Sequence, residues 1–552
     1  MRPTKTENLP PQALPEPNTT VQEATVAVHG VEIVLNQSDN SASSGPESTT
    51  TESQGGGRPA PPVPAQAQPA PAQVESKAAQ ALKLTQKHFQ LVKSQDGKAY
   101  AVETLSSNPQ AYRIDSNGFG SAIRRLAYSK NPGLLLTDDQ LNEVRSQLSA
   151  LADLSVATVA VWKRVAAIKH GIEIDVGDAA NTRIAVSPGE VEIVDKGSST
   201  LFYRSPNMLP FVLPAPKGDL RKLLRYLNLV ELEQWLLIAW IAYTLAHPKV
   251  PTTNYVLLVL QGDRGTGKSS LCNIVLCLLI DPSVVGVQAF PSNLQDFAIA
   301  AENAHVLFFD NQRSLTVTQS DVLCIVCTSG YLSNRLLYSD DRESVKRLHS
   351  AVVMNGIHPF IVEPDLAQRC LTLKLQPIDS ALRTSEKQLS EQFAKDLPEI
   401  FRGILDLIAG IFTHLPSVKP IQGERMIDFV RWLSAMEKAQ GFEEGYLQRG
   451  YSANLINARQ DFLNADPLAE AVLAFAQQQQ SWSGTPMDLL LALGAHTSPE
   501  VIVSHNWPKS PIALSLALKR LQSQLSGAGV DVEVGARSKL RKITVTYTGK
   551  SS

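Results

Sequence analysis

The alternation of apolar and polar positions divides the chain into a polar beginning and a long remainder with periodic apolar residues. Residues 1–78 are rich in Pro, Ser, Thr, Gln and Gly and include the run GGGRPAPPVPAQAQPAPAQ. Such a segment buries too little apolar surface to offset the entropy of ordering it, so we predict a disordered, low-complexity tail. Within it, ATVAVHGVEIVL at 24–35 alternates like a strand and is either a docking motif or an inert, marginal strand.

The remainder predicts an α/β protein with several domains, since a chain of 552 residues exceeds what one core holds. Residues 79–216 show helical periodicity at 137–154 and 156–169, followed by the alternating segments IEIDV, RIAV, VEIV and LFYR. This order predicts an N-terminal α/β domain that ends in a sheet. Across 217–380, buried strands alternate with helices, which is the pattern of a parallel sheet covered on both faces.

The end of the chain predicts a helical region followed by a winged helix. Residues 381–465 have a helical pattern, and residues 466–552 combine amphipathic helices with the hairpin-like DVEVGARSKLRKITVTYT. Many winged helices bind only protein, so this domain is predicted either to contact DNA or to dock a protein. Its candidate DNA-binding residues are Lys519 and Arg520 on the recognition helix and Arg541 and Lys542 in the hairpin.

Composition limits the classes of function. Lys and Arg number 51 against 53 Asp and Glu, so any nucleic-acid contact must come from local basic patches. The cysteines all lie in the middle of the chain, which fits a reduced, cytoplasmic protein. Cys324 and Cys327 form a C-x-x-C without a second ligand pair, so we interpret them as packed helix residues. The apolar run WLLIAWIAYTLA is shorter than the roughly 20 residues that span a bilayer, so it predicts a buried helix and no membrane segment.

A glycine-rich motif follows the buried strand YVLLVL at 255–260. The motif reads GDRGTGKS at 262–269 and leads into the helical LCNIVLCLLI, which is the strand, loop and helix context of a Walker A motif. Backbone N–H groups of such a loop cradle the phosphates of ATP, Lys268 reaches the β- and γ-phosphates, and the Ser269 hydroxyl binds Mg²⁺. The predicted nucleotide-binding residues are Gly262, Asp263, Arg264, Gly265, Thr266, Gly267, Lys268, Ser269 and Ser270.

A second buried strand, HVLFF at 305–309, ends in Asp310 and Asn311 and resembles a Walker B motif. Ligands gather at the carboxyl end of parallel strands, so Asp310 is predicted to hold Mg²⁺ together with Ser269, the alternative being a helix N-cap. Many ring ATPases carry a second carboxylate at the next position. Because the amide of Asn311 cannot accept a proton, we expect slow hydrolysis or another base, such as Glu302.

Two further residues follow the next strand, SAVVM at 350–354. Asn355 is predicted to hydrogen-bond the attacking water or the γ-phosphate as a sensor 1 residue, or else to be a turn residue before Gly356. In EPDLAQR, a short helix carries Arg369 to its end. Arg369 is either an arginine finger for the neighbouring subunit of a ring or an ordinary helix-end arginine.

A hairpin is predicted between the second and third strands, because the strand-like NRLLYS and VKRLHSAVVM flank residues 340–344. In a ring, its tip would enter the central channel, where Arg342, Lys346 or Arg347 could track a phosphate backbone. The tip also carries Asp340, Asp341 and Glu343, so a plain solvated turn is the alternative.

An acidic cluster in IEIDVGD, formed by Glu173, Asp175 and Asp178, could be the metal site of a primase or polymerase. Glu173 and Asp175 share a strand face, since side chains two residues apart point to the same side. The Gly177–Asp178 pair is equally typical of a turn, which makes the metal site the less favoured interpretation.

The motifs GDRGTGKS, VLFFDN, TSGYLSNRLLYSD, VVMNGI and PDLAQR, in this order, resemble the superfamily 3 and phage primase-helicase type of AAA+ ATPase of mobile genetic elements. The likeness extends upstream to YRSPNMLPFVLPAP and downstream to WPKSPIAL. The resemblance implies an α/β fold with a P-loop AAA+-like core, assembly into a hexamer or similar ring, and ATP sites between subunits. Some relatives carry a primase-polymerase domain ahead of the ATPase. Here the corresponding length is low-complexity sequence plus the α/β domain, so primase activity is not carried over.

The function predicted on this basis is that of an ATP-dependent DNA helicase or translocase, acting on single-stranded DNA or a fork during replication of a phage, plasmid or integrative element. The alternative is a non-translocating AAA+ switch, such as an initiator, a loader or a defence-system ATPase that binds DNA or protein. A translocase must place the hairpin in a channel, whereas a switch need not.

Overall fold

The computed structural model describes residues 75–104, 106–154, 158–335, 343–379, 381, 383–419, 423–504, 507–535 and 542–549. Residues from Gln73 to Ser552 form one compact unit. The predicted tail up to residue 74, including ATVAVHGVEIVL, lies outside the described residues.

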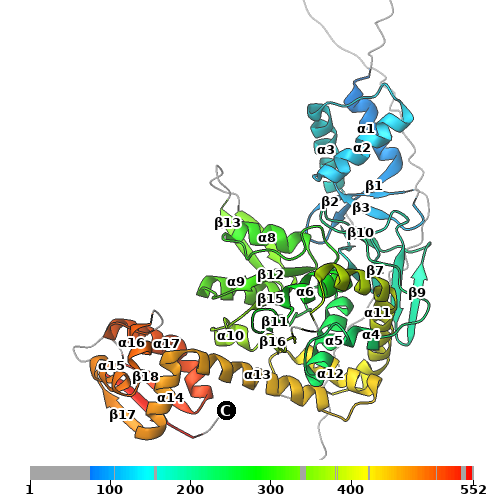
Figure 1. Cartoon of the computed structure of the whole chain (residues 1–552). Helices are drawn as coiled ribbons and strands as arrows, with labels where there is room; N and C mark the ends of the chain where they lie inside the picture. Colours follow the sequence, from blue (N-terminus) through cyan, green and yellow to red (C-terminus); the bar gives the residue numbers. More distant parts are fainter. Residues whose placement is uncertain are drawn as a thin grey trace, which may run out of the picture. The chain divides into compact units, whose positions relative to one another are not determined.

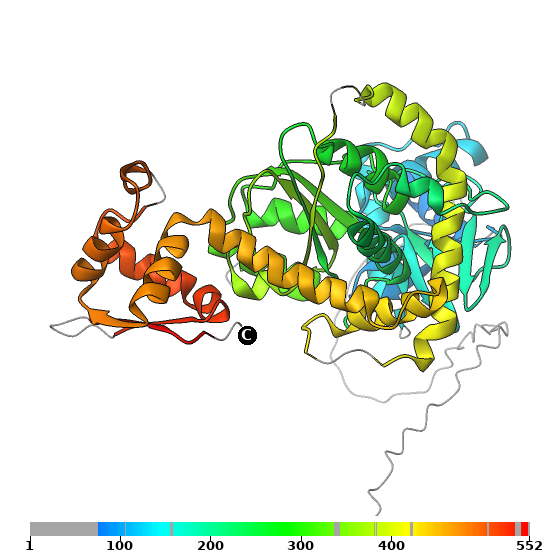
Figure 2. The ribbon, with the colours of Figure 1, turned by 60° about the horizontal axis from the view of Figure 1, so that its bottom comes forward.

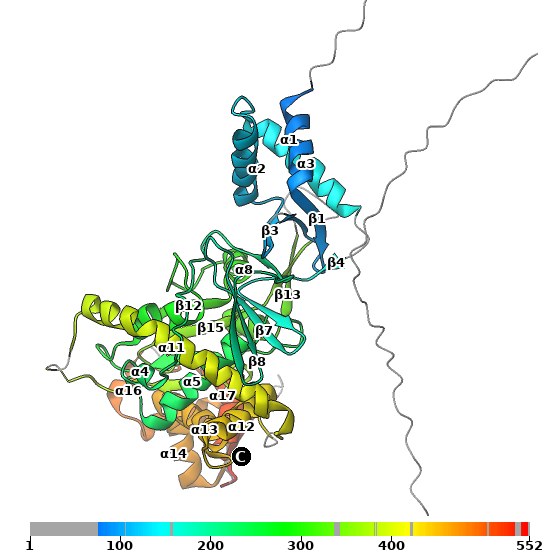
Figure 3. The same ribbon diagram turned by 90° about the vertical axis from the view of Figure 1, so that its right-hand side faces the viewer.

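The first part of this unit is a six-stranded sheet with three helices. Phe89, Phe119 and Tyr112 make edge-on and tilted ring contacts in the core between these helices and the sheet, and Figure 3 shows α1, α2 and α3 beside β1 and β3. The strands follow the order β4-β1-β2-β3-β10-β5. The elements are α1 (Lys77–His88), β1 (Phe89–Ser94), β2 (Ala99–Glu103), β3 (Gln110–Arg113), α2 (Asn117–Lys130), α3 (Asp138–Asp153), β4 (Thr158–Val159), β5 (Val161–Trp162) and β10 (Leu201–Tyr203).

The helix predicted at 156–169 is wrong, because the described part of this segment forms β4, β5 and β6 (Val165–Ile168). Val159, Val161 and Val165 are β-branched, and such side chains lose rotamer freedom in a helix but pack well on a pleated sheet. The apolar spacing of this segment also fits a helix, so the choice of strand over helix depends on pairing with other strands of the two sheets.

A second, antiparallel sheet follows in the order β6-β7-β8-β9. Ile172, Ile174 and Ile184 of this sheet share one core with the helices α5 (Glu231–Ala246) and α11 (Glu386–His414). Residues 79–216 therefore contain two sheets, of which the second packs on the central and helical parts of the protein. The remaining elements are β7 (Gly171–Asp175), β8 (Arg183–Ser187) and β9 (Glu190–Val194).

The central sheet is parallel throughout, as predicted, with the order β12-β15-β11-β16. Its strands are β11 (Leu257–Gln261), β12 (Val306–Gln312), β15 (Ala351–Gly356) and β16 (Cys370–Lys374), visible side by side in Figure 1. Leu258 and Leu260 face one core and Leu257 and Val259 face the other, so helices cover both faces. On one face lie α5 (Glu231–Ala246), α6 (Lys268–Ser270), η1 (Leu271–Leu276) and α7 (Cys277–Ile280), and on the other lie α8 (Leu294–Asn303) and α9 (Val317–Cys327).

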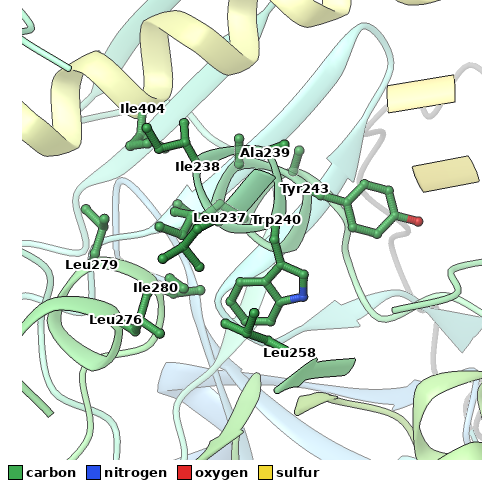
Figure 4. Packing of buried hydrophobic residues seen from close by; sticks show 14 of the residues in the cluster. Leu237, Ile238, Ala239, Trp240, Tyr243, Leu258, Leu276, Leu279, Ile280 and Ile404 are labelled. Carbon is green, nitrogen blue, oxygen red and sulfur yellow. The ribbon is translucent and has the colours of Figure 1, made fainter. Parts of the chain in front are cut away.

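Helix α5 is the predicted buried helix and lies at the centre of the larger core. Trp240 is fully buried and donates its indole N–H to the Val256 carbonyl at 2.7 Å. Figure 4 shows Trp240 beside Leu258, with Leu276 and Ile280 of the helix after the glycine-rich loop close by. The indole thus fastens α5 to the segment that enters β11.

The hairpin predicted before the third strand is present as β13 (Gly330–Arg335) and β14 (Glu343–Leu348), paired antiparallel with Gly330 opposite Leu348. Its tip at 336–342 lies outside the described residues. Two short helices, α4 (Arg221–Leu224) and α10 (Pro364–Ala367), precede α5 and β16.

The helical region contains α11 (Glu386–His414), η3 (Leu415–Ser417), α12 (Ile427–Gln440) and α13 (Tyr446–Ala465). By length and composition, Glu386–Ser417 could cross a membrane, but half of its apolar window is buried inside the protein. Buried Glu437 of α12 accepts the backbone N–H groups of Gly445 and Leu447 at 2.8 and 2.7 Å, which caps the start of α13.

The last elements are α14 (Pro467–Gln479), β17 (Ser481–Gly484), α15 (Pro486–Ala495), α16 (Pro499–Val503), α17 (Pro511–Gly527), β18 (Val530–Val534) and β19 (Ile543–Tyr547). The strands pair antiparallel in the order β17-β19-β18, so this part combines helices with a small antiparallel sheet, and its assignment as a winged helix stays a prediction. Figure 2 shows α13 as one continuous helix leading to this domain. Residues 536–541 of the wing are outside the described part.

Candidate functional site

The glycine-rich loop leaves the carboxyl end of β11 in a conformation that requires glycine. Gly262, Gly265 and Gly267 have φ angles of 152°, 80° and 85°. A Cβ on Gly262 would lie 2.9 Å from Thr266 Oγ1, a contact too short for a real side chain. The Thr266 hydroxyl also donates to the Asp263 carbonyl at 2.9 Å, closing the loop on itself. The result is a narrow turn in which a Cβ at Gly262 would collide with Thr266.

Lys268 begins the helix after the loop, and its amine points back into the turn. Nζ donates to the carbonyls of Gly262 and Asp263 at 2.7 and 2.8 Å. Desolvation lowers the pKa of Lys268, while the charges of Asp263 and Asp310 raise it. The positive charge therefore occupies the centre of the loop, at the N-terminus of a helix, where an anion is stabilised.

Ser269, on helix α6, and Asp310, on strand β12, come together. The Ser269 hydroxyl lies 3.3 Å from both carboxylate oxygens of Asp310, which follows the buried part of β12. Hydroxyl and carboxylate oxygens are ligands that Mg²⁺ accepts together with water and phosphate. No group of three or more His, Cys, Asp or Glu side chains in the described part of the chain forms a complete metal cage. The pair thus fits an ion that shares its ligands with a phosphate.

The residue after Asp310 is held by the next strand. Asn311 has a left-handed backbone conformation, with φ at 55°, at a bulge in the pairing of β12 with β15. Its N–H donates to Oδ1 of buried Asn355 at 3.0 Å, and the Asn355 amide faces Cys272 Sγ at 3.6 Å. The side chain of Asn311 is exposed. Asn355 thus fixes the backbone beside Asp310.

Glu302, offered by the sequence as another base, is held in two ion pairs. It lies at the end of α8, and Lys98 Nζ and Arg113 Nη1 of the N-terminal sheet approach it at 2.7 and 2.6 Å. Burial raises the pKa of Glu302, but the hydrogen bond and charge of Lys98, with the charges of Lys163 and Arg113, lower it to about 2. A carboxylate held ionised by two cations is a poor proton acceptor near neutral pH.

Arg369 lies at the opposite edge of the sheet. Its carbonyl accepts the N–H of Leu257 at 2.9 Å, so it is level with the start of β11, whereas the glycine-rich loop follows the end of that strand. The length of β11 separates the two by about 16 Å at roughly 3.3 Å per residue. Its Nε lies 3.4 Å from Asp365 Oδ2. Arg369 therefore does not join Lys268, Ser269, Asp310 and Asn355 within one chain.

The predicted DNA-binding residues of the hairpin differ in orientation. Lys346 and Arg347 are neighbours on β14 and so point to opposite sides of the hairpin. Arg347 donates through Nε to Ser329 Oγ at 2.8 Å, and its Nη2 is buried without a hydrogen-bond partner. Arg342 lies outside the described residues. Of the two described cations, Arg347 is committed to the protein and Lys346 is the candidate for DNA.

In the winged helix, Lys519 and Arg520 are exposed on α17. Arg520 Nη2 lies 3.9 Å from Asp466 Oδ2, at the start of α14. Lys542 is exposed just before β19, and Arg541 lies outside the described residues. These cations belong to the helix and the wing that a winged helix uses for contact.

The segment between β16 and α11 also lies near the loop, and no sequence motif predicts it. A Cβ on Gly265 would lie 3.1 Å from the guanidinium of Arg383, and one on Gly267 would lie 3.4 Å from Ile378 Cδ1. Ser270 Oγ donates to Glu386 Oε1 at 3.2 Å, at the first residue of α11. The chain between β16 and α11 therefore lies against the glycine-rich loop. No local sequence pattern marks this contact, because it depends on the chain returning to the carboxyl edge of the sheet after β16.

The acidic cluster of β7 is satisfied by the protein itself. Asp175 pairs with buried Arg183 and with Arg204, whose Nη2 lies 2.7 Å from Asp175 Oδ1. Glu173 accepts the hydroxyl groups of Ser198 and Thr200. Asp178 accepts the Thr182 N–H at 2.8 Å in a turn. These carboxylates therefore stabilise the fold.

The two cysteines of the C-x-x-C lie on α9 as free thiols.

A cavity of about 240 Å³ lies apart from the glycine-rich loop, between β12, α8 and the N-terminal sheet. Lys163, Tyr203 and Asn303 line it. Desolvation lowers the pKa of Lys163 to about 8, although the charge of Glu302 raises it. The cavity contains none of the residues predicted to bind nucleotide.

Comparisons with known proteins identify two regions. Residues 220–461 match the family described as actinomycete integrative conjugative element replication protein, and residues 468–552 match the RepA C-terminal domain of the same elements. No curated protein matches the chain. An A-form apo structure of the NrS-1 C-terminal region is 13% identical and covers 85% of this chain and 99% of that one, with a TM-score of 0.36. A second apo structure of that region is 12% identical and covers 86% of this chain and 100% of that one, with a TM-score of 0.30.

Proposed function

We propose that this chain, which belongs through residues 220–461 and 468–552 to the replication proteins of actinomycete integrative conjugative elements, is a ring-forming P-loop ATPase that moves along or remodels DNA. One observation carries the proposal. Lys268, Ser269 and Asp310 gather at the carboxyl edge of a parallel sheet, beside a loop whose three glycines adopt positive φ angles.

In this proposal, the loop N–H groups and Lys268 bind the phosphates of ATP, and Ser269 with Asp310 holds Mg²⁺. The ion, when bound, neutralises charge on the phosphates. Asn355 keeps the backbone at Asn311 in place, so that the exposed Asn311 amide can orient water next to Asp310. Since an amide accepts no proton and Glu302 is held by two cations, turnover is expected to be slow without a stimulating partner.

The position of Arg369 supports a site completed by a second copy of the chain. Arg369 lies level with the start of β11, so it cannot reach the phosphates bound after the end of that strand. In a head-to-tail ring, the same edge faces the loop of the neighbouring copy. Arg369 would then act as an arginine finger, which stabilises charge developed in the transition state.

The hairpin contains a feature that favours the alternative function, a non-translocating switch. Arg347 is bound to Ser329, so of the two predicted DNA-binding residues in the described part of the hairpin, Lys346 remains for phosphate contact. A translocase needs repeated phosphate contacts in its channel. The exposed Lys519, Arg520 and Lys542 give the winged helix a competing basic surface. A loader or initiator would hold DNA there.

The decisive experiment measures steady-state ATP hydrolysis by the full chain with and without single-stranded DNA, across a range of salt concentrations. A DNA motor is expected to hydrolyse ATP faster on its track, and the stimulation should fall as salt rises. Hydrolysis that DNA leaves unchanged would favour the switch. Absence of any hydrolysis, together with no binding of a fluorescent ATP analogue, would overturn the ATPase assignment itself.

A further inference from the structure

Asp365 holds two arginines from distant parts of the chain. Arg369 Nε lies 3.4 Å from its Oδ2, and Arg425 Nη1 forms a hydrogen-bonded ion pair with its Oδ1. Arg369 follows α10, whereas Arg425 comes from the segment that leads into α12. One carboxylate thus fixes two guanidinium groups side by side at one edge of the sheet.

This cluster carries excess positive charge. Two arginines against one carboxylate leave a net charge of about +1, since guanidinium stays protonated at any physiological pH. Asp365 and Arg425 have 53% and 39% of their side chains exposed, whereas Arg369 has 12%. Arg425 is therefore accessible from outside, whereas Arg369 is mostly covered. Two guanidinium groups held by one carboxylate, with one of them accessible, are suited to a multiply charged anion.

The nucleotide of the same chain cannot be that anion. Asp365 and Arg369 precede β16, and the amino end of β16 lies beside Leu257 at the start of β11. The glycine-rich loop follows the other end of β11. The contact with Asp365 keeps Arg425 at the same edge as Arg369.

We propose that Arg425 is a second arginine acting on the nucleotide of the neighbouring copy, together with Arg369. This inference rests on the proposed ring ATPase and extends it by a residue outside every motif of the sequence. The class of ligand is the polyphosphate of a nucleoside triphosphate. A planar guanidinium binds two phosphate oxygens at once, and two of them spread the charge that develops during phosphoryl transfer.

The test uses Arg425→Ala in the full chain, measured for ATP turnover and for binding of a fluorescent ATP analogue. We expect kcat to fall by about 10² with nucleotide binding retained, because loss of one preorganised donor costs roughly that much. Arg425→Lys should retain part of the rate, since the charge stays but the fork is lost. Arg431→Ala is the matched control, an exposed arginine whose Nη2 donates to the Leu415 carbonyl at 2.9 Å.

Mixing separates action between copies from action within one chain. Lys268→Ala copies cannot turn over ATP but supply Arg425, and Arg425→Ala copies have an intact loop. Combined in equal amounts, they should regain activity at about a quarter of the interfaces of a head-to-tail ring. No regain, with assembly shown by size-exclusion chromatography, would overturn the inference, as would wild-type turnover by Arg425→Ala.

The two proposals fail in different ways. If Lys268→Ala hydrolyses ATP at the wild-type rate, the assigned nucleotide site is wrong. If Lys268→Ala is inactive while Arg425→Ala behaves like Arg431→Ala, the site stands and only the role of Arg425 is lost. If Arg425→Ala does not fold, which a lower Tm would show, then Arg425→Lys replaces it in the same mixing experiment and decides the outcome.

Discussion

The side-chain oxygen of Asn355 accepts the backbone N–H of Asn311 at 3.0 Å, so the third strand fixes the turn that follows Asp310. Asn355→Ala removes this contact and leaves the rest of β15 unchanged. We expect kcat to fall by roughly 10² while nucleotide affinity changes little, because a misplaced catalytic group costs about that factor. Steady-state kinetics with a parallel binding titration checks this. An unchanged kcat would show that the contact serves only the fold.

Lys268→Ala should abolish ATP turnover and leave the Tm near that of the wild type. The amine bonds only to loop carbonyls and a threonine hydroxyl in the structure, so its loss leaves no buried charge unpaired. Arg431→Ala, at an exposed position of α12 outside the loop, is the control and should retain most of the turnover. A large drop in Tm for Lys268→Ala would mean that the lysine holds the loop together.

The Glu302 ion pairs predict a stability that depends on pH. The folded pKa of Glu302 is about 2, below its usual value, so its contribution is complete above about pH 4.5 and is lost as the pH falls towards 2. At neutral pH, Glu302→Gln should cost on the order of 2 kcal/mol, after allowance for partial exposure. Thermal unfolding of both proteins from pH 7 to 2.5 checks this, and their Tm values should converge in acid. Glu391→Gln, from the exposed pair with Lys387, should change the Tm little.

Trp240→Ala should destabilise the protein by about 3–5 kcal/mol, since it opens a cavity in the core and leaves the Val256 carbonyl without its donor. Thermal or denaturant unfolding measures the change. Leu213→Ala, at a half-exposed side chain, should stay within about 0.5 kcal/mol. Equal effects of the two substitutions would contradict the central position of α5.

Lys346→Ala should weaken binding of single-stranded DNA and reduce its salt dependence by roughly one unit of slope, as expected for one lost phosphate contact. Arg347→Ala should instead lower the Tm, because Arg347 bonds to Ser329 inside the hairpin. Fluorescence anisotropy at several salt concentrations checks both. If Lys346→Ala binds DNA normally while Lys519→Ala with Lys542→Ala does not, the winged helix holds the DNA and the switch gains support.

Much of the central architecture could be predicted because its signals are local. The strands β11, β12 and β15 contain short apolar runs followed by polar residues, and each appears near its predicted position. The segment at 156–169 failed because its valines fit a helical spacing but pair as strands. Local pattern alone does not decide between these outcomes.

The parts of the site that the sequence did not predict depend on long-range contacts. The cations that hold Glu302 lie about two hundred positions earlier, at Lys98 and Arg113. Arg425 meets Asp365 across sixty positions, and Arg383 reaches the loop only because the chain returns to that edge. Such partners have no fixed spacing, so no motif contains them.

Helix α8 connects three parts of the protein that have been described separately. Its last turn carries Glu302, which is tied to the N-terminal sheet, its side packs against β14 of the hairpin, and its end leads into β12 and Asp310. Helix α8, ten residues long, thus joins the N-terminal sheet to the hairpin and to the strand that carries Asp310. A substitution at Lys98, which removes one of the two cations at Glu302, is therefore expected to affect the hairpin and the segment before Asp310 as well.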